Sequence, residues 1–170
     1  TYKISGPQVG VEKEIIKKVC DLIGYNNKPG GTFPTGGSMS NFMSLIIARD
    51  KKDEEIIHKG FKDNLVAYTS ENAHYSMAKN ASFSGLGKEN IRYIKCNEYG
   101  QMDYELLESQ IKNDLDNNLI PFYINATAGT TVLCVFDNIE EISKVSKKYN
   151  LWLHVDGAFG GSVIFTEKYK

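Results

Sequence analysis

The stretch from Asn150 to Gly161, which reads N-L-W-L-H-V-D-G-A-F-G-G, constrains the fold more than any other part of the sequence. Its apolar run from Leu151 to Val155 is typical of a strand that is covered on both faces. The run ends at the acid Asp156, and small residues follow at once. A carboxylate at the mouth of a buried strand is costly unless cations or several hydrogen-bond donors meet it. Asp156 therefore indicates a ligand site at the end of the strand, with a helix cap or a turn as an equally compatible alternative.

Strand-like and helix-like segments alternate along the whole sequence. Helical periodicity predicts helices at 9–23, 38–52, 74–83, 103–115 and 137–148, and short apolar runs predict strands at 65–69, 91–94, 120–126, 151–156 and 162–165. This alternation favours an α/β fold with a mostly parallel sheet and flanking helices, joined by right-handed crossovers. No linker or internal repeat divides the sequence, so we expect residues 1–170 to form a single domain.

Two local patterns refine these assignments. Asp137 with Glu140 three residues later predicts a capping box at the start of the last helix. In the helix at 103–115, the apolar residues Leu106, Leu107 and Ile111 are expected to face the core.

The charge balance argues against function classes that depend on a strong electrostatic field. The 170 residues include 20 basic and 21 acidic ones, which gives a net charge of −1. We therefore expect neither nucleic acid nor a membrane surface as a partner. The uncharged stretch at 119–136 contains too many polar residues for a membrane span. Cys20, Cys96 and Cys134 form neither a metal-ligand spacing nor a disulfide framework, which predicts a cytoplasmic protein without a metal site.

Three further segments carry groups that are suited to binding. Gly36-Gly37-Ser38 opens a predicted helix, where backbone N–H groups can bind an anion; a plain N-cap serine is the simpler alternative. His74 follows a predicted strand and can stack on a planar ligand, transfer a proton or be purely structural. The turn from Thr127 to Thr131 ends another strand and offers hydroxyl groups, although an ordinary tight turn could have the same residues.

These groups gain meaning when they are considered together. They comprise a phosphate cradle, a ring platform, a hydroxyl-rich turn and a carboxylate, which is the set that pyridoxal phosphate requires. The carboxylate keeps the pyridine nitrogen of this cofactor protonated, so that the ring can withdraw electrons. His154 shares a sheet face with Asp156 by the two-residue period, and we interpret it as a packed core histidine.

Four blocks of the sequence match a known enzyme family in their order: GGSMSN at 36–41, SENAHYS at 70–76, NATAGTT at 125–131 and LWLHVDGAFGG at 151–161. They resemble the group II pyridoxal-phosphate-dependent amino-acid decarboxylases, and the resemblance covers residues 1–170. The segments PFYINATAGTT and IKCNEYG are most similar to the glutamate and cysteine-sulfinate branch. The resemblance implies decarboxylation of an amino acid, with glutamate, cysteine sulfinate or aspartate as the expected substrates and pyridoxal 5′-phosphate as the cofactor.

The resemblance also implies roles for individual residues. Gly37 and Ser38 would hold the cofactor phosphate. His74 would stack on one face of the cofactor ring and take part in catalysis. Asp156 would pair with the pyridinium nitrogen as a second catalytic residue, and Ala158 would pack against the other ring face.

The family resemblance further implies a fold and an assembly. The fold is the cofactor-binding large domain of type I, aspartate-aminotransferase-like enzymes, and the assembly is a homodimer with active sites at the subunit interface. Thr131 would lie near the phenolic oxygen of the cofactor or near the contact between the aspartate and the pyridine ring.

The sequence also departs from the family pattern. Gly157 stands where the family usually has alanine, and Phe159 where it usually has tryptophan or tyrosine; we expect both to be tolerated. Lys168 and Lys170 follow the aspartate too closely to be the family's Schiff-base lysine. We therefore expect that the lysine segment, an N-terminal segment and a C-terminal small domain lie outside this chain, and that the chain alone is inactive.

Two alternatives remain open on the sequence. The first is another type I reaction such as transamination or aldol cleavage, since these enzymes share the aspartate and the phosphate cradle. The second is that the chain as it stands is a non-catalytic binding or assembly module, which the missing lysine would favour.

Overall fold

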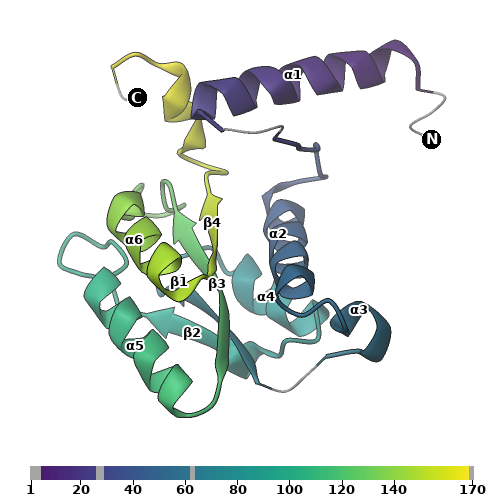
Figure 1. Ribbon diagram of the computed structural model, residues 1–170. Coiled ribbons are helices and arrows are strands. Elements are labelled where there is room, and N and C mark those ends of the chain that lie inside the picture. Colours follow the sequence, from purple (N-terminus) through teal and green to yellow (C-terminus); the bar gives the residue numbers. More distant parts are fainter. Residues whose placement is uncertain (1–4, 26–28, 62–63, 169–170) are drawn as a thin grey trace. The chain divides into compact units, whose positions relative to one another are not determined.

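The computed structural model describes residues 5–25, 29–61 and 64–168 (Figure 1). The chain forms two compact units. One comprises the residues up to Thr35 together with those from Ser162 onward, and the other comprises Gly36 to Gly161. All the sheet strands belong to the second unit, within the described ranges.

The first unit contains one long helix, α1 (Pro7–Ile23). Pro7 stands in its first turn, where the missing N–H costs nothing and the fixed φ suits a helix. The helix ends at Gly24, which adopts the left-handed conformation with a φ of 84° and donates its N–H to the carbonyl of Cys20. The helix predicted at 9–23 and its glycine end are therefore confirmed.

The second unit alternates helices and strands, as predicted. In chain order its elements are α2 (Gly37–Lys52), α3 (Ile56–Lys59), β1 (Leu65–Ser70), α4 (Ser76–Phe83), the 3-10 helix η1 (Lys88–Asn90), β2 (Ile91–Ile94), α5 (Tyr104–Asp116), β3 (Ile120–Thr127), α6 (Ile139–Tyr149) and β4 (Trp152–Asp156). A second 3-10 helix, η2 (Gly161–Phe165), follows β4.

The strands form a parallel sheet in the order β2-β1-β3-β4. The expected α/β class is therefore confirmed. The register places Asn125 of β3 opposite His154 of β4, and Thr127 opposite Asp156. Because parallel strands end on the same side, the turns after β1, β3 and β4 meet along one edge of the sheet.

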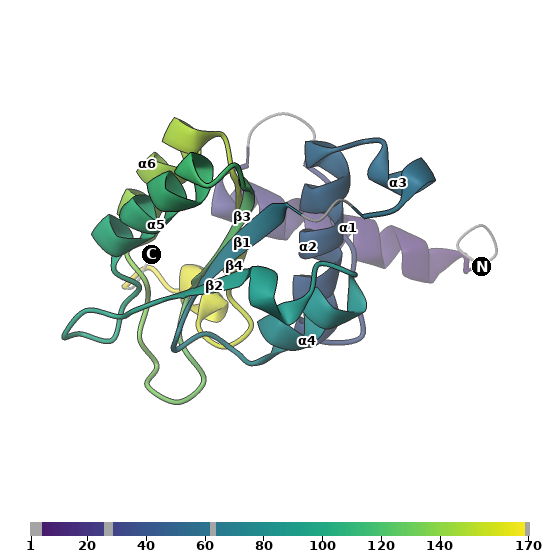
Figure 2. The same cartoon turned by 90° about the horizontal axis from the view of Figure 1, so that it is seen from below.

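Helices cover both faces of this sheet, as Figure 2 shows. Helices α2 and α4 lie on one face, over a core that includes Leu45, Met77 and Tyr123. Helices α5 and α6 lie on the other face, over a core that includes Leu107 and Ile142. The helices are amphipathic, so burying their apolar faces against the sheet is the main stabilising term of this unit.

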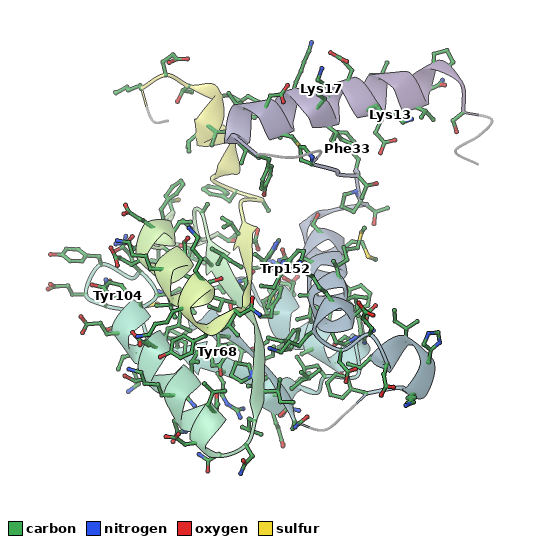
Figure 3. All side chains as sticks on the ribbon, viewed as in Figure 1. Lys13, Lys17, Phe33, Tyr68, Tyr104 and Trp152 are labelled. Carbon is green, nitrogen blue, oxygen red and sulfur yellow. The ribbon has the colours of Figure 1, made fainter. Side chains whose placement is uncertain are left out.

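A buried carboxylate ties the second core to the sheet. Asp114 of α5 accepts a hydrogen bond of 2.8 Å from the hydroxyl of Tyr68 in β1, and Nε of Arg92 in β2 lies 3.2 Å from its other oxygen. Figure 3 labels Tyr68 in this layer. Burial raises the pKa of Tyr68 well above its usual range, so its hydroxyl stays a donor.

Three local predictions were wrong. The stretch predicted as a strand at 162–165 belongs to η2. Leu106, expected in the core, has 45% of its surface exposed, because the buried face of α5 is the one that carries Leu107 and Ile111. The strand β4 is only half-buried along most of its length rather than covered on both faces, since it forms an edge of the four-stranded sheet.

The predicted capping box at Asp137 was also wrong. Asn138 is the N-cap of α6, and its side chain accepts from the N–H of Glu141. Asp137 is buried instead, and its two oxygens accept the backbone N–H groups of Met102 and Thr127, each at 2.7 Å. The carboxylate thus ties the end of β3 to the segment before α5, and its burial raises the pKa of Asp137.

Two negative findings apply to the part of the chain that the structure describes. None of its helices combines the length and the apolar character that a bilayer crossing would need. It also contains no group of three or more His, Cys, Asp or Glu side chains that could hold a metal ion.

Candidate functional site

A cavity of about 300 Å³ opens at the edge where the strands of the second unit end. Its walls come from the start of α2, the segment before α4, and the turns that follow β3 and β4. All six residues that the sequence singled out line it. The full lining consists of Gly37, Ser38, Asn41, His74, Thr127, Gly129, Thr131, Asp156, Ala158 and Phe159.

The carboxylate of Asp156 is the most buried charge in this lining, with 8% of the residue's surface exposed. The side-chain amide of Asn41 donates to its Oδ2 at 2.8 Å. The backbone N–H of Ala158 donates to its Oδ1 at 3.1 Å, which closes a local turn. The structure therefore shows the turn that the sequence offered as one alternative, and the same carboxylate also lines the cavity. Two acceptor sites of the carboxylate are occupied, and an ionised carboxylate has about four.

The first turn of α2 forms the wall that is suited to an anion. Gly36 precedes the helix with a φ of 152°, which L-residues rarely adopt, and its carbonyl accepts from the N–H groups of Met39 and Ser40. The N–H groups of Gly37 and Ser38 lie in the first turn of α2, where the helix has no carbonyl four residues back to accept them. A Cβ at Gly37 would lie 3.2 Å from Cβ of Ala158, so glycine at this position avoids a tight contact across the cavity.

His74 lines the cavity from the segment before α4 and is half-buried. Its Nδ1 accepts the backbone N–H of Ser76 at 3.2 Å. In the neutral imidazole the proton therefore sits on Nε2. The ring of Tyr75 lies 4.2 Å from the His74 ring, centroid to centroid, with a tilt of 38°.

The threonine turn after β3 is held in place by Asp137 and by its own side chains. Thr130 is buried, and its hydroxyl accepts the N–H of Val135 at 3.1 Å. Gly129 has a φ of 87°, and a Cβ there would lie 2.9 Å from the backbone of Gly160. The hydroxyl of Thr127 is buried without a hydrogen-bond partner among the described residues, in a side chain that lines the cavity. Such an atom is suited to a partner supplied by water or by a bound molecule.

Sequence reasoning missed Asn41. This residue belongs to the GGSMSN block, but only the glycines and the serine were considered. Asn41 lies four residues after Gly37, so both occupy the same face of α2. That spacing is the signal that could have identified it. His154, expected to be a packed core residue, is half-buried and lies 2.8 Å from the Asn41 amide oxygen through Nε2.

The two positions at which the sequence departs from the family pattern, Gly157 and Phe159, lie in the turn after β4. A Cβ at Gly157 would lie 3.1 Å from Cα of Gly161, which is tight. Phe159 lines the cavity with more than half of its surface exposed.

Gly160→Ala is expected to disturb the site, because its Cβ would lie 2.5 Å from the carbonyl oxygen of Ala128 and 2.6 Å from Cζ of Phe136. Relieving this overlap requires the turns after β3 and β4 to separate. We expect a loss of about 1–3 kcal/mol in the free energy of unfolding of the full-length protein, measured by thermal or urea denaturation. Gly161→Ala is the matched control, since a Cβ there meets no described atom within 4 Å. Equal stability of the two variants would contradict the close approach.

The fold and the site together define a class of protein. A parallel α/β sheet presents a buried carboxylate, an imidazole and a hydroxyl-rich turn beside a helix N-terminus, all at the carboxyl ends of its strands. This arrangement is suited to a planar, phosphorylated cofactor that carries a ring nitrogen.

Over residues 1–170 the chain matches the pyridoxal-dependent decarboxylase conserved domain, and it belongs to this family. The family expected from the four sequence blocks is therefore confirmed.

Individual relatives agree with this assignment. The chain is 40% identical over 172 residues to the acidic amino acid decarboxylase GADL1 of Xenopus tropicalis and 39% identical over 172 residues to the cysteine sulfinic acid decarboxylase of Rattus norvegicus. All of this chain is covered in both alignments, but only 34% and 35% of the two relatives. The crystal structure of mouse CSAD in apo form superposes with a TM-score of 0.96 at 38% identity, covering 100% of this chain and 36% of that one. The chain thus spans about a third of the length of these relatives.

Proposed function

We propose that the full-length protein carrying this chain removes the α-carboxylate of an acidic amino acid, with pyridoxal 5′-phosphate as its cofactor. The observation that carries the proposal is the buried carboxylate of Asp156, held by two donors in the wall of the cavity. Similarity to decarboxylases named for acidic amino acids and for cysteine sulfinic acid supports the substrate class. Glutamate, aspartate and cysteine sulfinate are the proposed substrates.

The residues of the cavity are suited to this cofactor in shape and charge. The N–H groups of Gly37 and Ser38, for which no acceptor is seen among the described residues, favour an anionic phosphate, and Gly37 lets it approach closely. The hydroxyl of Thr127, which has no hydrogen-bond partner within the described part of the chain, is a buried polar atom that a bound molecule can satisfy. We propose that Gly37 and Ser38 hold the phosphate and that Thr131 lies near the phenolic oxygen.

The ring of the cofactor would lie between His74 and Ala158, with its nitrogen toward Asp156. When bound, pyridoxal phosphate supplies a protonated pyridine ring that withdraws the electron pair released as the bond from the α-carbon to the carboxylate breaks. Asp156, as an anion, would hold the proton at the ring nitrogen. His74, with a proton on Nε2, would stack on the ring and move a proton at the reacting carbon. The net reaction converts an amino acid and one proton into an amine and carbon dioxide.

We also propose a homodimer and a cytoplasmic location for the full-length protein. Large apolar side chains on the loop after β3 support an interface, since Val132 is 87% exposed and Leu133 54% exposed. Light scattering of the full-length protein tests the dimer, and fractionation of the source cells tests the location. The covalent lysine anchor outside residues 1–170 and the single-domain assignment stay predictions.

The proposed function is tested by measuring carbon dioxide release from a panel of amino acids by the full-length protein. We expect turnover of at least one of glutamate, aspartate and cysteine sulfinate, and dependence on added pyridoxal phosphate after the protein has been stripped of cofactor. Aromatic amino acids serve as the comparison and are expected to react much more slowly. Formation of a keto acid without carbon dioxide would instead favour the transaminase alternative.

A further inference from the structure

The buried side chain of Asn41 in α2 makes hydrogen bonds to α4 and to β4. Only 2% of its surface is exposed. Its Nδ2 donates to Oδ2 of Asp156 at 2.8 Å and to the hydroxyl of Ser76 at 3.1 Å. Its Oδ1 lies 2.8 Å from Nε2 of His154. Both N–H groups and the carbonyl of the carboxamide are therefore engaged, which leaves a single orientation for this side chain.

The carboxylate dictates the direction of this hydrogen-bond chain. An ionised carboxylate only accepts, so Asn41 must present its NH₂ group to Asp156 and its carbonyl to His154. A carbonyl in turn requires a donor, so Nε2 of His154 must carry a proton. Burial lowers the pKa of His154, although the charge of Asp156 opposes this effect, so its neutral form is favoured. The one proton of that neutral ring is then fixed on Nε2.

We propose that Asn41 and His154 are positioning residues, which fix the Asp156 carboxylate for the nitrogen of a pyridine-type ring. This inference rests on the proposed function. Asn41 holds one carboxylate oxygen and the N–H of Ala158 holds the other, so the plane of the carboxylate is set from both sides. His154 acts through Asn41, because without its donor the carboxamide oxygen loses its partner and the side chain is held less firmly against the carboxylate.

The first test compares two ligands in the full-length protein after removal of cofactor. One is pyridoxal phosphate, and the other is its analogue with C–H in place of the ring nitrogen. Asn41→Leu keeps the approximate volume and removes every polar contact. We expect it to weaken pyridoxal phosphate binding by about 10-fold to 100-fold, the scale of one hydrogen bond to a charged group. We expect the affinity for the analogue to change by less than about 3-fold, because the analogue has no nitrogen for Asp156 to meet.

The second test separates positioning from structural support through His154. His154→Gln offers an N–H donor to Asn41 and is expected to keep wild-type affinity within about 3-fold, whereas His154→Leu should approach the loss seen in Asn41→Leu. The double variant Asn41→Leu/His154→Leu should bind no more weakly than Asn41→Leu alone, since His154 acts through Asn41. The matched control is Asn113→Leu, the same substitution at an exposed position of α5, far in sequence from Asn41, His154 and Asp156. It should leave both affinities unchanged.

The possible outcomes test the role of Asn41, the role of His154 and the proposed function separately. Equal losses for pyridoxal phosphate and the analogue in Asn41→Leu would overturn the positioning role and leave Asn41 as structural support. Additive losses in the double variant, or failure of His154→Gln to restore binding, would overturn the role of His154. If the wild-type protein binds neither ligand, the proposed function is contradicted, and so is the inference that rests on it. Thermal midpoints of the cofactor-free variants show whether a lost affinity merely reflects a loosened fold.

Discussion

Asp156→Ala in the full-length protein is expected to lower the rate of decarboxylation by at least about 10²-fold, the scale for removing one preorganised electrostatic group. The carboxylate lies in the cavity wall, where burial strengthens its interaction with a positive ring nitrogen. The start of α2, which we propose holds the phosphate, is untouched by this change, so some cofactor should remain bound. Carbon dioxide release and cofactor absorbance measure the two effects separately.

Alanine at position 156 also removes the acceptor for Asn41 and for the N–H of Ala158. Asp156→Asn is therefore the second variant, since it keeps the shape of the side chain, removes the charge and replaces one acceptor oxygen with an NH₂ donor. We expect a comparable loss of rate from it. Asp116→Ala, at the exposed end of α5, is the matched control and should leave the rate of decarboxylation unchanged. Activity of Asp156→Asn within a few-fold of wild type would remove the charge from the mechanism.

The sequence predicts the location of the site because topology leaves little choice. Apolar runs mark the strands, and a parallel sheet places their carboxyl ends along one edge. The segments that follow three of these runs carry His74, the turn from Thr127 to Thr131, and Asp156. Once the strands are assigned correctly, these residues must lie close together, and they line one cavity.

The contacts of Asn41 with His154 and Asp156 could not be predicted in the same way. Asn41 and His154 are separated by 113 positions, and Asn41 and Asp156 by 115. Their contact depends on how α2 packs against the sheet face that carries Trp152, His154 and Asp156. Trp152, labelled in Figure 3, belongs to that face, and the Lys51 amine of α2 lies 5.3 Å from its ring centre. The packing of a helix on a sheet is a tertiary property, and the period of a single helix does not encode it.

Asp137 shows how a long-range contact overrides a local pattern. Its spacing to Glu140 satisfies the capping rule, but Asn138 performs that task. Two buried backbone N–H groups, from Met102 and Thr127, would otherwise lack acceptors, and a carboxylate can serve both. The same contact fixes the turn that carries Thr131 into the cavity. A residue that looked like a helix signal therefore contributes to the geometry of the site.

His74→Phe in the full-length protein is expected to reduce decarboxylation by about 10²-fold or more while cofactor absorbance persists. Phenylalanine keeps a flat ring of similar size for stacking and removes both ring nitrogens. Nε2 is the nitrogen whose proton is available, because Nδ1 is engaged by the N–H of Ser76. The loss of rate should therefore appear in kcat rather than in the affinity for the cofactor.

The lost acceptor for Ser76 could also loosen the segment before α4, so the thermal midpoint should be measured beside the rate. His74→Asn helps to separate the two effects, because its side-chain oxygen can still accept that N–H although no ring remains to stack. We expect it to lose cofactor affinity as well as rate. Tyr75→Phe is the matched control: its ring lies next to His74 and is largely exposed, and removing its hydroxyl should change neither quantity. A His74→Phe variant with the wild-type rate would show that His74 supplies only a stacking surface, and proton transfer would then have to come from another group.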